Sequence, residues 1–122
     1  MSASILIVDD STSIRVAIRM ALTGAGYTVS EAADGAQGLS KASGSRFDMI
    51  ITDLNMPNMD GLTMIRELRK SPDQCGTPII FLTTESDDSM KQQAKAAGAT
   101  GWLVKPFVPE QLIKVSRKVL GR

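Results

Sequence analysis

The stretch Ile5-Leu6-Ile7-Val8-Asp9-Asp10 decides how this chain folds. Its apolar, mostly β-branched residues are typical of a buried strand that delivers two acids at its carboxyl end. A second run, Met49-Ile50-Ile51-Thr52, ends in the same way at Asp53. Carboxyl ends of parallel strands meet at one edge of a sheet, where ligands bind. Three acids crowded there would raise each other's pKa unless a cation shares the site, so the pattern predicts a divalent cation held by oxygens.

A simpler interpretation is that these acids only solvate the ends of strands. It would serve for a single acid. It explains poorly an adjacent pair and a third aspartate, each directly after an apolar strand.

Length and charge are those of one ordinary globular domain, residues 1–122. The chain is 43% hydrophobic and has a formal net charge of +1, which favours neither nucleic acid nor a membrane as a partner. The first strand begins within about four residues of the N-terminus, which leaves no room for a secretory signal. Cys75 is the only cysteine and can form no internal disulfide. We expect a cytoplasmic protein.

Strand and helix signals alternate along the whole chain. Strands are predicted at residues 4–8, 27–31, 47–52, 78–83 and 101–104. Helix starts are predicted after Ser11, after Asp34, near Gly61, around Asp87 and Asp88, and at Pro109. The alternation predicts an α/β fold with a five-stranded parallel sheet and helices on both faces. We expect strand order 2-1-3-4-5, with the alternating strand 27–31 at an edge.

Two further strand ends face the same edge of the predicted sheet. One strand ends in Thr83-Thr84-Glu85 and the last ends in Lys105-Pro106. A lysine beside carboxylates would form an ordinary salt bridge or neutralise an incoming phosphoryl group. A threonine hydroxyl can donate to a phosphoryl oxygen, although threonine at a strand end is common for propensity alone. Each signal is weak by itself, but the lysine and the threonine together with the three acids make a strong signal for a functional site.

In their order along the chain, these residues resemble the receiver domain of bacterial two-component response regulators. The matching positions are Asp9-Asp10, Asp53 within Asp53-Leu54-Asn55-Met56-Pro57, Gly61, Thr83 and Lys105-Pro106-Phe107. The resemblance runs from about Ile5 to Leu120 and implies a flavodoxin-like (βα)5 fold. We expect a single receiver domain with no output domain, most similar to CheY-like chemotaxis receivers. Stand-alone phosphorelay receivers share that architecture.

The resemblance implies a role for each matching residue. Asp53 would be the phosphoacceptor. Asp10 and Asp53 would ligate Mg²⁺ directly, Asp9 would do so through water, and Asn55 would contribute its backbone carbonyl. Magnesium suits such a set because it takes a few carboxylates plus phosphate and keeps several waters. Lys105 would pair with the phosphoryl group, and the transfer would be catalysed by positioning and charge neutralisation.

Other positions are implied to govern switching and turnover. Thr83 would hydrogen-bond the phosphoryl group when the switch closes, and Trp102, where the family usually has a smaller aromatic ring, would respond. Asn55 and Glu85 would border the path of attacking water and tune dephosphorylation. The Lys105-Pro106 peptide is expected to be cis.

The function implied is that of a signalling switch and not of a conventional enzyme, because it would catalyse only its own phosphorylation and dephosphorylation. The phosphodonor would be a histidine kinase. The output partner would be a flagellar motor switch protein or a phosphotransfer protein, bound through the face made by the fourth helix, fifth strand and fifth helix. A phosphatase is a further expected partner, and the chain is expected to be a monomer. Chemotaxis, as motor control or as a phosphate sink, is the leading role, and a phosphorelay shuttle is the alternative.

Two alternatives of other classes fit the sequence less well. An aspartyl-phosphate hydrolase of the haloacid dehalogenase type needs an Asp-x-Asp pair after its first strand, but Ser11 stands where the second Asp should be. A flavodoxin-like electron carrier needs a hydroxyl- and glycine-rich phosphate loop there, and Asp9-Asp10-Ser11-Thr12 is too acidic to receive a flavin phosphate. A DNA-binding regulator would need a second domain.

Overall fold

The computed structural model describes residues 3–54, 56–71, 76–83 and 88–121. Strands and helices alternate as β1 Ser4–Val8, α1 Thr12–Gly24, β2 Thr28–Ala32, α2 Gly35–Gly44, β3 Met49–Asp53, α3 Gly61–Lys70, β4 Ile79–Thr83, α4 Asp88–Ala97, β5 Gly101–Val104 and α5 Pro109–Leu120. The strands form one parallel sheet in the order β2-β1-β3-β4-β5, which confirms the predicted topology and the edge position of β2.

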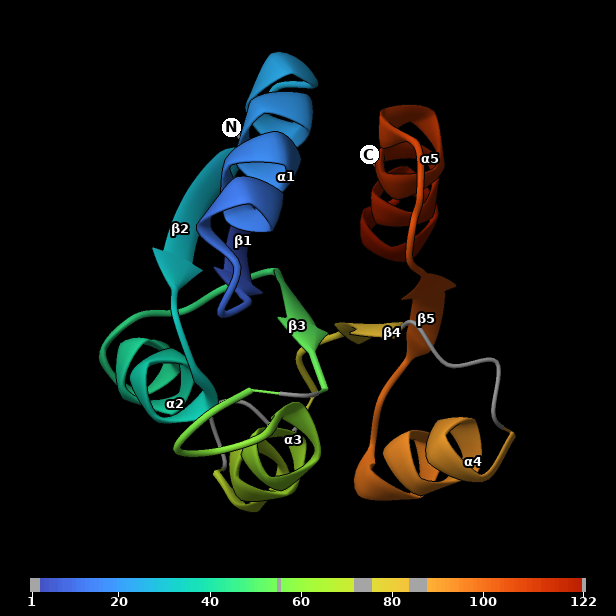
Figure 1. The fold of residues 1–122 in the computed structure, drawn as a ribbon. Helices are drawn as coiled ribbons and strands as arrows, with labels where there is room; N and C mark the ends of the chain where they lie inside the picture. The colour runs from blue at the N-terminus through green and yellow to red at the C-terminus, as the bar shows by residue number, and fades with distance from the viewer. Residues whose placement is uncertain (1–2, 55, 72–75, 84–87, 122) are drawn as a thin grey trace.

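Helices cover both faces of the sheet. Figure 1 shows α1 and α5 on one face and α2, α3 and α4 on the other. Successive residues of a strand point to opposite faces, so each central strand supplies both cores. Leu6, Ile50 and Phe81 pack toward α2, α3 and α4, whereas Ile7 and Ile51 pack toward α1 and α5.

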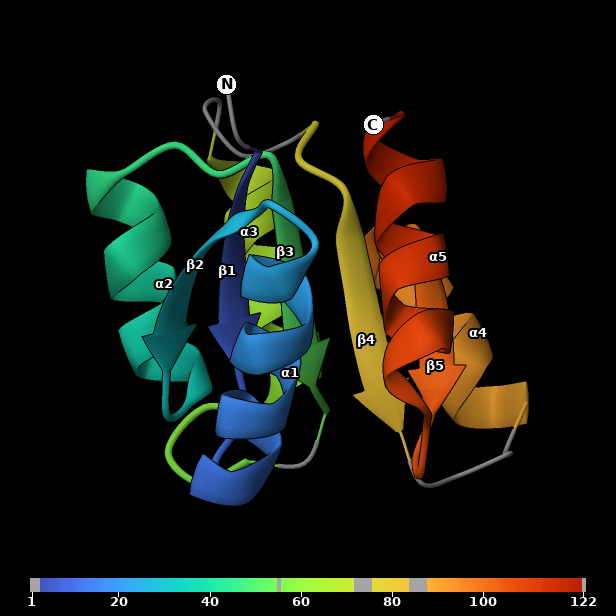
Figure 2. The same ribbon diagram turned by 90° about the horizontal axis from the view of Figure 1, so that it is seen from above.

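The central strands are apolar because water reaches neither of their faces. Every residue of β3 and β4 is buried, and so are four of the five residues of β1. The edge strand β2 has only Ala32 buried, in keeping with its mixed sequence. In Figure 2 all the strand arrows point toward the same edge, which is the edge where α1 begins.

Side-chain caps set where several helices begin. The Oγ of Ser11 accepts a hydrogen bond from the Ile14 N–H at 3.3 Å, at the start of α1. Asp34 and Asp60 cap α2 and α3 by accepting from the N–H groups of Gln37 at 2.8 Å and Thr63 at 2.7 Å. These bonds satisfy donors that the first turn of a helix leaves unpaired. No described helix is long and apolar enough to cross a membrane.

Some details differ from the sequence-based expectation. The strand predicted at 47–52 runs from Met49 to Asp53, because Asp48 instead bonds Ser4 through both its backbone N–H and its carboxylate. The spacing of apolar residues along α1 predicts that Ala17 faces the core, but Ala17 is exposed. On α2 the same spacing predicts a buried Leu39, which is only partly buried.

The loop after Asp53 is held close to the strand that precedes it. The Gly61 N–H donates to the Leu54 carbonyl at 3.0 Å. A Cβ at position 61 would lie 2.0 Å from the Asp53 carbonyl oxygen, so the close approach needs glycine. The backbone at Gly61 therefore fixes the path that the chain takes away from the end of β3.

Gly61→Ala is expected to lower the free energy of unfolding by about 1–3 kcal/mol, because backbone atoms must move to admit the methyl group. Chemical denaturation followed by circular dichroism measures this. Gly44→Ala is the matched control, since nothing lies within 4 Å of a Cβ there, and it should leave the protein as stable or more stable. Equal stability of the Gly61 and Gly44 variants would contradict the close approach.

Candidate functional site

The three aspartates named from the sequence lie together at the carboxyl edge of the sheet. β1 and β3 are neighbours, with Val8 beside Thr52, so the next residue of each strand reaches the same point. Asp9, Asp10 and Asp53 each offer a carboxylate oxygen, and these oxygens lie within 4.8 Å of one another. The expected convergence of the acids is confirmed.

The environments of the three carboxylates differ. Asp9 is fully buried, Asp53 is 8% exposed, and Asp10 is open to solvent. The Asp9 Oδ1 accepts from the Ser11 N–H at 2.9 Å, and the Asp53 Oδ1 accepts from the Leu54 N–H at 2.8 Å. Main-chain donors therefore fix one oxygen of each of the two less exposed carboxylates.

Lys105 joins the same two carboxylates through their other oxygens. Its Nζ lies 3.1 Å from the Oδ2 of Asp9 and 3.1 Å from the Oδ2 of Asp53. The backbone N–H of Lys105 donates to the Thr83 carbonyl at 2.7 Å, which ties the end of β5 to the end of β4. The Lys105-Pro106 peptide is cis, as expected.

Burial and charge oppose each other in this cluster. Burial raises the pKa of the Asp9 carboxyl above its usual value, and the Ser11 N–H and Lys105 only partly counter it. Burial alone would lower the pKa of Lys105, but its bonds and attraction to Asp9 and Asp53 outweigh burial and raise that pKa. The lysine is thus held in its charged form, beside carboxylates that repel one another.

Thr83 and Trp102 occupy different surroundings. Thr83 ends β4 next to the acidic cluster and is buried. Trp102 lies on the α4 side of β5, 37% exposed. Its ring stacks on Phe81 with a centroid separation of 6.1 Å, and the Lys91 Nζ lies 4.8 Å from its ring centroid. The structure therefore places Thr83 at the acidic edge and Trp102 on the neighbouring surface.

Two positions with predicted roles lie outside the described residues. They are Asn55, with its backbone carbonyl, and Glu85. Asp87, named with Asp88 as a helix start, also lies outside the described residues. The metal contact assigned to Asn55 and the tuning of dephosphorylation by Asn55 and Glu85 stay predictions.

The sequence-based analysis missed Arg15. Its guanidinium donates to the backbone carbonyl of Asp9 at 2.5 Å and lies 3.4 Å from the Glu31 carboxylate. The signal available in the sequence was a cation in the first turn of a helix that starts just after two acids, together with an acid in the edge strand. Their contact spans 16 positions (15 to 31) and depends on the pairing of β1 with β2, which periodicity does not show.

The donor set suits a small hard cation. Carboxylate oxygens are the ligands that Mg²⁺ prefers, and the exposure of Asp10 leaves room for the waters that this ion keeps. A positive charge at this point would also relieve the repulsion among the three acids. Asp9, Asp10 and Asp53 therefore fit a magnesium ion by their chemistry.

Comparison with known protein families agrees with this geometry. Residues 5–117 match the model of the response regulator receiver domain, which is nearly the whole chain. The chain belongs to this family. The helices and strands described above are thus those of a receiver domain, and the acidic edge lies where its parallel strands end.

Curated relatives include longer regulators. The chain is 38% identical over 122 residues to the response regulator MprA of Mycobacterium ulcerans. The aligned region covers all of this chain and 52% of that protein. It is 35% identical over 118 residues to the transcriptional regulatory protein ResD of Bacillus subtilis, covering 97% of this chain and 48% of that protein. The chain spans about half the length of these relatives.

Solved structures include receivers of similar length. The chemotaxis response regulator CheY4 of Vibrio cholerae superposes with a TM-score of 0.95 at 50% identity, covering 98% of this chain and all of that one. The receiver domain of the sensor histidine kinase PA1611 of Pseudomonas aeruginosa superposes with a TM-score of 0.92 at 30% identity, with full coverage of both chains. That structure has a magnesium ion coordinated in its active site cleft.

Asp10→Ala is expected to weaken Mg²⁺ binding by about tenfold or more, because one of three charged oxygen ligands is lost. In the absence of metal the variant should be more stable than the unmodified receiver domain, since repulsion among the carboxylates is relieved. Calorimetric titration with Mg²⁺ and thermal melts in a chelator measure the two effects. Glu67→Ala removes a half-buried acid on α3, away from the acidic cluster, and serves as the control. Unchanged Mg²⁺ affinity in Asp10→Ala would count against the site.

Proposed function

We propose that this receiver domain is a phosphorylation-controlled signalling switch in which Asp53 accepts a phosphoryl group from the phosphohistidine of a histidine kinase. One observation carries the assignment. Among the described residues, Asp53 is the member of the acidic cluster that is paired with Lys105 and keeps a small exposed fraction, 8%. Asp9 is paired with the same lysine but is fully buried. Asp10 is exposed but has no ion pair with a described residue.

The proposed chemistry is the transfer of a phosphoryl group between two nucleophiles. An oxygen of Asp53 forms the new P–O bond as the P–N bond to the donor histidine breaks, and the departing ring nitrogen takes up a proton. Lys105 lies where it can neutralise charge on the transferred group. When bound by Asp10 and Asp53 directly and by Asp9 through water, Mg²⁺ would supply further neutralisation of the phosphoryl oxygens.

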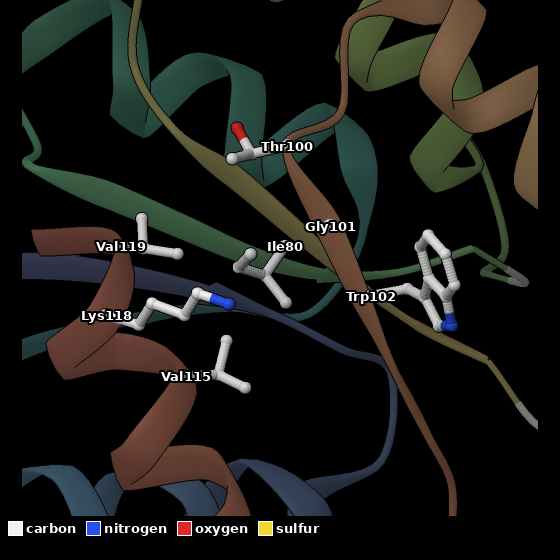
Figure 3. Close-up of a pocket in the computed structure, with 7 residues that line it drawn as sticks. All are labelled: Ile80, Thr100, Gly101, Trp102, Val115, Lys118 and Val119. Atoms are coloured by element: carbon white, nitrogen blue, oxygen red, sulfur yellow. The ribbon is translucent and has the colours of Figure 1, made fainter.

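The output is proposed to be read on the surface made by α4, β5 and α5. Trp102, Val104 and Val108 are exposed there at 37%, 41% and 52%. A groove of about 450 Å³ lies between β5 and α5, and its lining includes Gly101, Val115 and Lys118. Figure 3 shows Trp102 pointing to the other side of β5 from the α5 residues, so the strand separates two parts of one surface.

Chemotaxis is the role we favour for the switch, as control of a flagellar motor switch protein or as a phosphate sink. Its support is the 50% identity to a chemotaxis regulator whose whole length is matched. A phosphorelay shuttle that passes the group to a phosphotransfer protein is the alternative, because receivers of kinases superpose nearly as well. Membership of the receiver family removes the dehalogenase and electron-carrier alternatives. We place the protein in the cytoplasm, as a monomer that a phosphatase could also engage.

Binding to each kind of partner separates the two roles. The receiver domain loaded with Mg²⁺ and a phosphoryl mimic would be titrated against a motor switch protein and against a phosphotransfer protein from the same cell. Motor control predicts that only the first binds, and more tightly with the mimic than without. Phosphoryl exchange with the second protein would favour the shuttle.

Asp53→Asn is expected to abolish phosphorylation, because an amide is a poor nucleophile and also weakens the metal site. The unmodified protein, incubated with Mg²⁺ and acetyl phosphate, should gain one acid-stable, base-labile phosphoryl group, detected by intact-mass spectrometry. Asp60→Asn makes the same chemical change at the start of α3 and keeps the helix cap, so it should be labelled like the unmodified protein. Full labelling of Asp53→Asn would disprove the assignment.

Thr83→Ala is expected to uncouple Trp102 from the phosphorylation site. Adding Mg²⁺ and beryllofluoride to the unmodified protein should change the emission of Trp102, because Thr83 is drawn toward the phosphoryl mimic and its neighbours repack. The single tryptophan makes fluorescence a direct measurement. Thr63→Ala, on the exposed side of α3, should respond like the unmodified protein. A Trp102 ring that never moves would give no spectral change in any of these proteins.

A further inference from the structure

Arg15 connects three elements next to the acidic cluster. It lies in the first turn of α1, and its side chain folds back toward the end of β1. The Nη1 donates to the Asp9 carbonyl oxygen at 2.5 Å, and the Nη2 donates to the Thr12 hydroxyl at 3.3 Å. The Nε lies 3.4 Å from the Oε1 of Glu31, on β2. One planar group thus fixes the relative positions of α1, β1 and β2.

Glu31 is itself held in place. It is in register with Ile7 of β1, two residues before Asp9, so its carboxylate lies beside the β1–α1 turn. The Oε2 accepts from the Arg19 Nη1 at 2.7 Å, one turn further along α1. The side chain of Arg15 is only 16% exposed, and that of Glu31 is 25% exposed. The contact is therefore more shielded from water than an ordinary surface ion pair.

The Asp9 carbonyl belongs to the peptide group that leads into Asp10. The carboxylates of Asp9 and Asp53 are each fixed by a main-chain N–H and by Lys105. By contrast, no described residue donates a hydrogen bond or forms an ion pair with the Asp10 carboxylate. The direction in which Asp10 leaves the chain is therefore set by its backbone, and Arg15 is the side chain that bonds the preceding carbonyl.

We propose that Arg15, held by Glu31, is a positioning residue that orients the peptide between Asp9 and Asp10 so that the Asp10 carboxylate points into the cation site. This inference rests on the proposed function, since it assumes that Asp9, Asp10 and Asp53 bind Mg²⁺. It adds a residue that touches neither the metal nor the phosphoryl group. Groups that orient metal ligands in this way typically change metal affinity by about 10- to 100-fold when removed.

The charge of Arg15, taken alone, predicts the opposite effect of its removal on Mg²⁺ affinity. A guanidinium near a cation site repels the incoming ion, so removing the charge would strengthen Mg²⁺ binding. Arginine and lysine separate the two effects. Lysine at position 15 would keep the charge but has a single nitrogen, which cannot bond the Asp9 carbonyl and also present a planar face to Glu31 and Thr12.

The test is calorimetric titration of Mg²⁺ into the metal-free receiver domain and four variants. Arg15→Gln and Arg15→Lys should both weaken binding by about tenfold, the lower end of the range for orienting groups. Glu31→Gln should weaken it less and in the same direction, and it provides a second route should the Arg15 variants fold poorly. Arg19→Gln is the matched control, because Arg19 binds the same Glu31 but forms no hydrogen bond or ion pair with Asp9. The Mg²⁺ affinity of this variant should stay within about twofold of the unmodified protein. Circular dichroism and thermal melts in the presence of a chelator confirm that each titrated variant is folded.

Three results would overturn the proposal. Stronger Mg²⁺ binding in Arg15→Gln with unchanged binding in Arg15→Lys would show an effect of charge only. Unchanged affinity in both would show that Arg15 has no positioning role. Equal weakening in Arg15→Gln, Arg15→Lys and Arg19→Gln would show a general loss of packing between α1 and β2. Asp10→Asn distinguishes failure of the proposed function: if the unmodified protein binds no Mg²⁺, or Asp10→Asn binds it equally well, the metal site itself is wrong.

Discussion

The amine of Lys105, shared between the carboxylates of Asp9 and Asp53 at 3.1 Å each, is the contact on which the acidic edge of this sheet depends. Three carboxylates within 4.8 Å of one another repel strongly where water is partly excluded. The lysine neutralises part of that charge and fixes one oxygen of each of two acids. It can do so only because β5 is the last strand of the parallel sheet and ends at the same edge as β1 and β3, with its Lys105 N–H bonded to the end of β4.

The same contact explains how a phosphoryl group could act as a signal. A dianionic phosphoryl group on Asp53 would compete with the Asp9 and Asp53 carboxylates for the Lys105 amine. Phosphorylation would then change the partners of Lys105. The Lys105 N–H donates to the Thr83 carbonyl, so a displacement of one strand end would strain its bond to the other. A charge-assisted contact of this kind can favour one of two states by enough to shift their populations. The acidic edge and the proposed output surface thus share the strands β4 and β5.

The local pattern of apolar and acidic residues predicted much of this structure. Apolar runs that end in acids placed β1 and β3, and parallel pairing then required Asp9, Asp10 and Asp53 to meet. Features that depend on contacts between distant segments were out of reach. Gly38 is buried so closely that a Cβ there would lie 2.8 Å from both the Met64 sulfur and a Val8 methyl. Glycine has no side chain from which a hydrophobic pattern could predict this contact. Arg15 was missed for a related reason, since its role depends on which residue of β2 lies beside β1.

The attachment of α4 decides which part of the output surface can move. Ala94 is the only residue of this helix that is buried among those described, so packing holds it weakly. Its carboxyl-terminal end is fastened more firmly, because the Nε and Nη2 of Arg69 on α3 both donate to the Gly98 carbonyl, at 3.1 and 2.6 Å. A displacement of α4 would therefore pivot about Gly98. Lys91, one turn nearer the moving end than Lys95, would then shift more over the Trp102 ring, from its present 4.8 Å, than Lys95 from its 5.9 Å. The two lysine–ring distances would change by different amounts, so the environment of Trp102 is sensitive to a small rotation of α4.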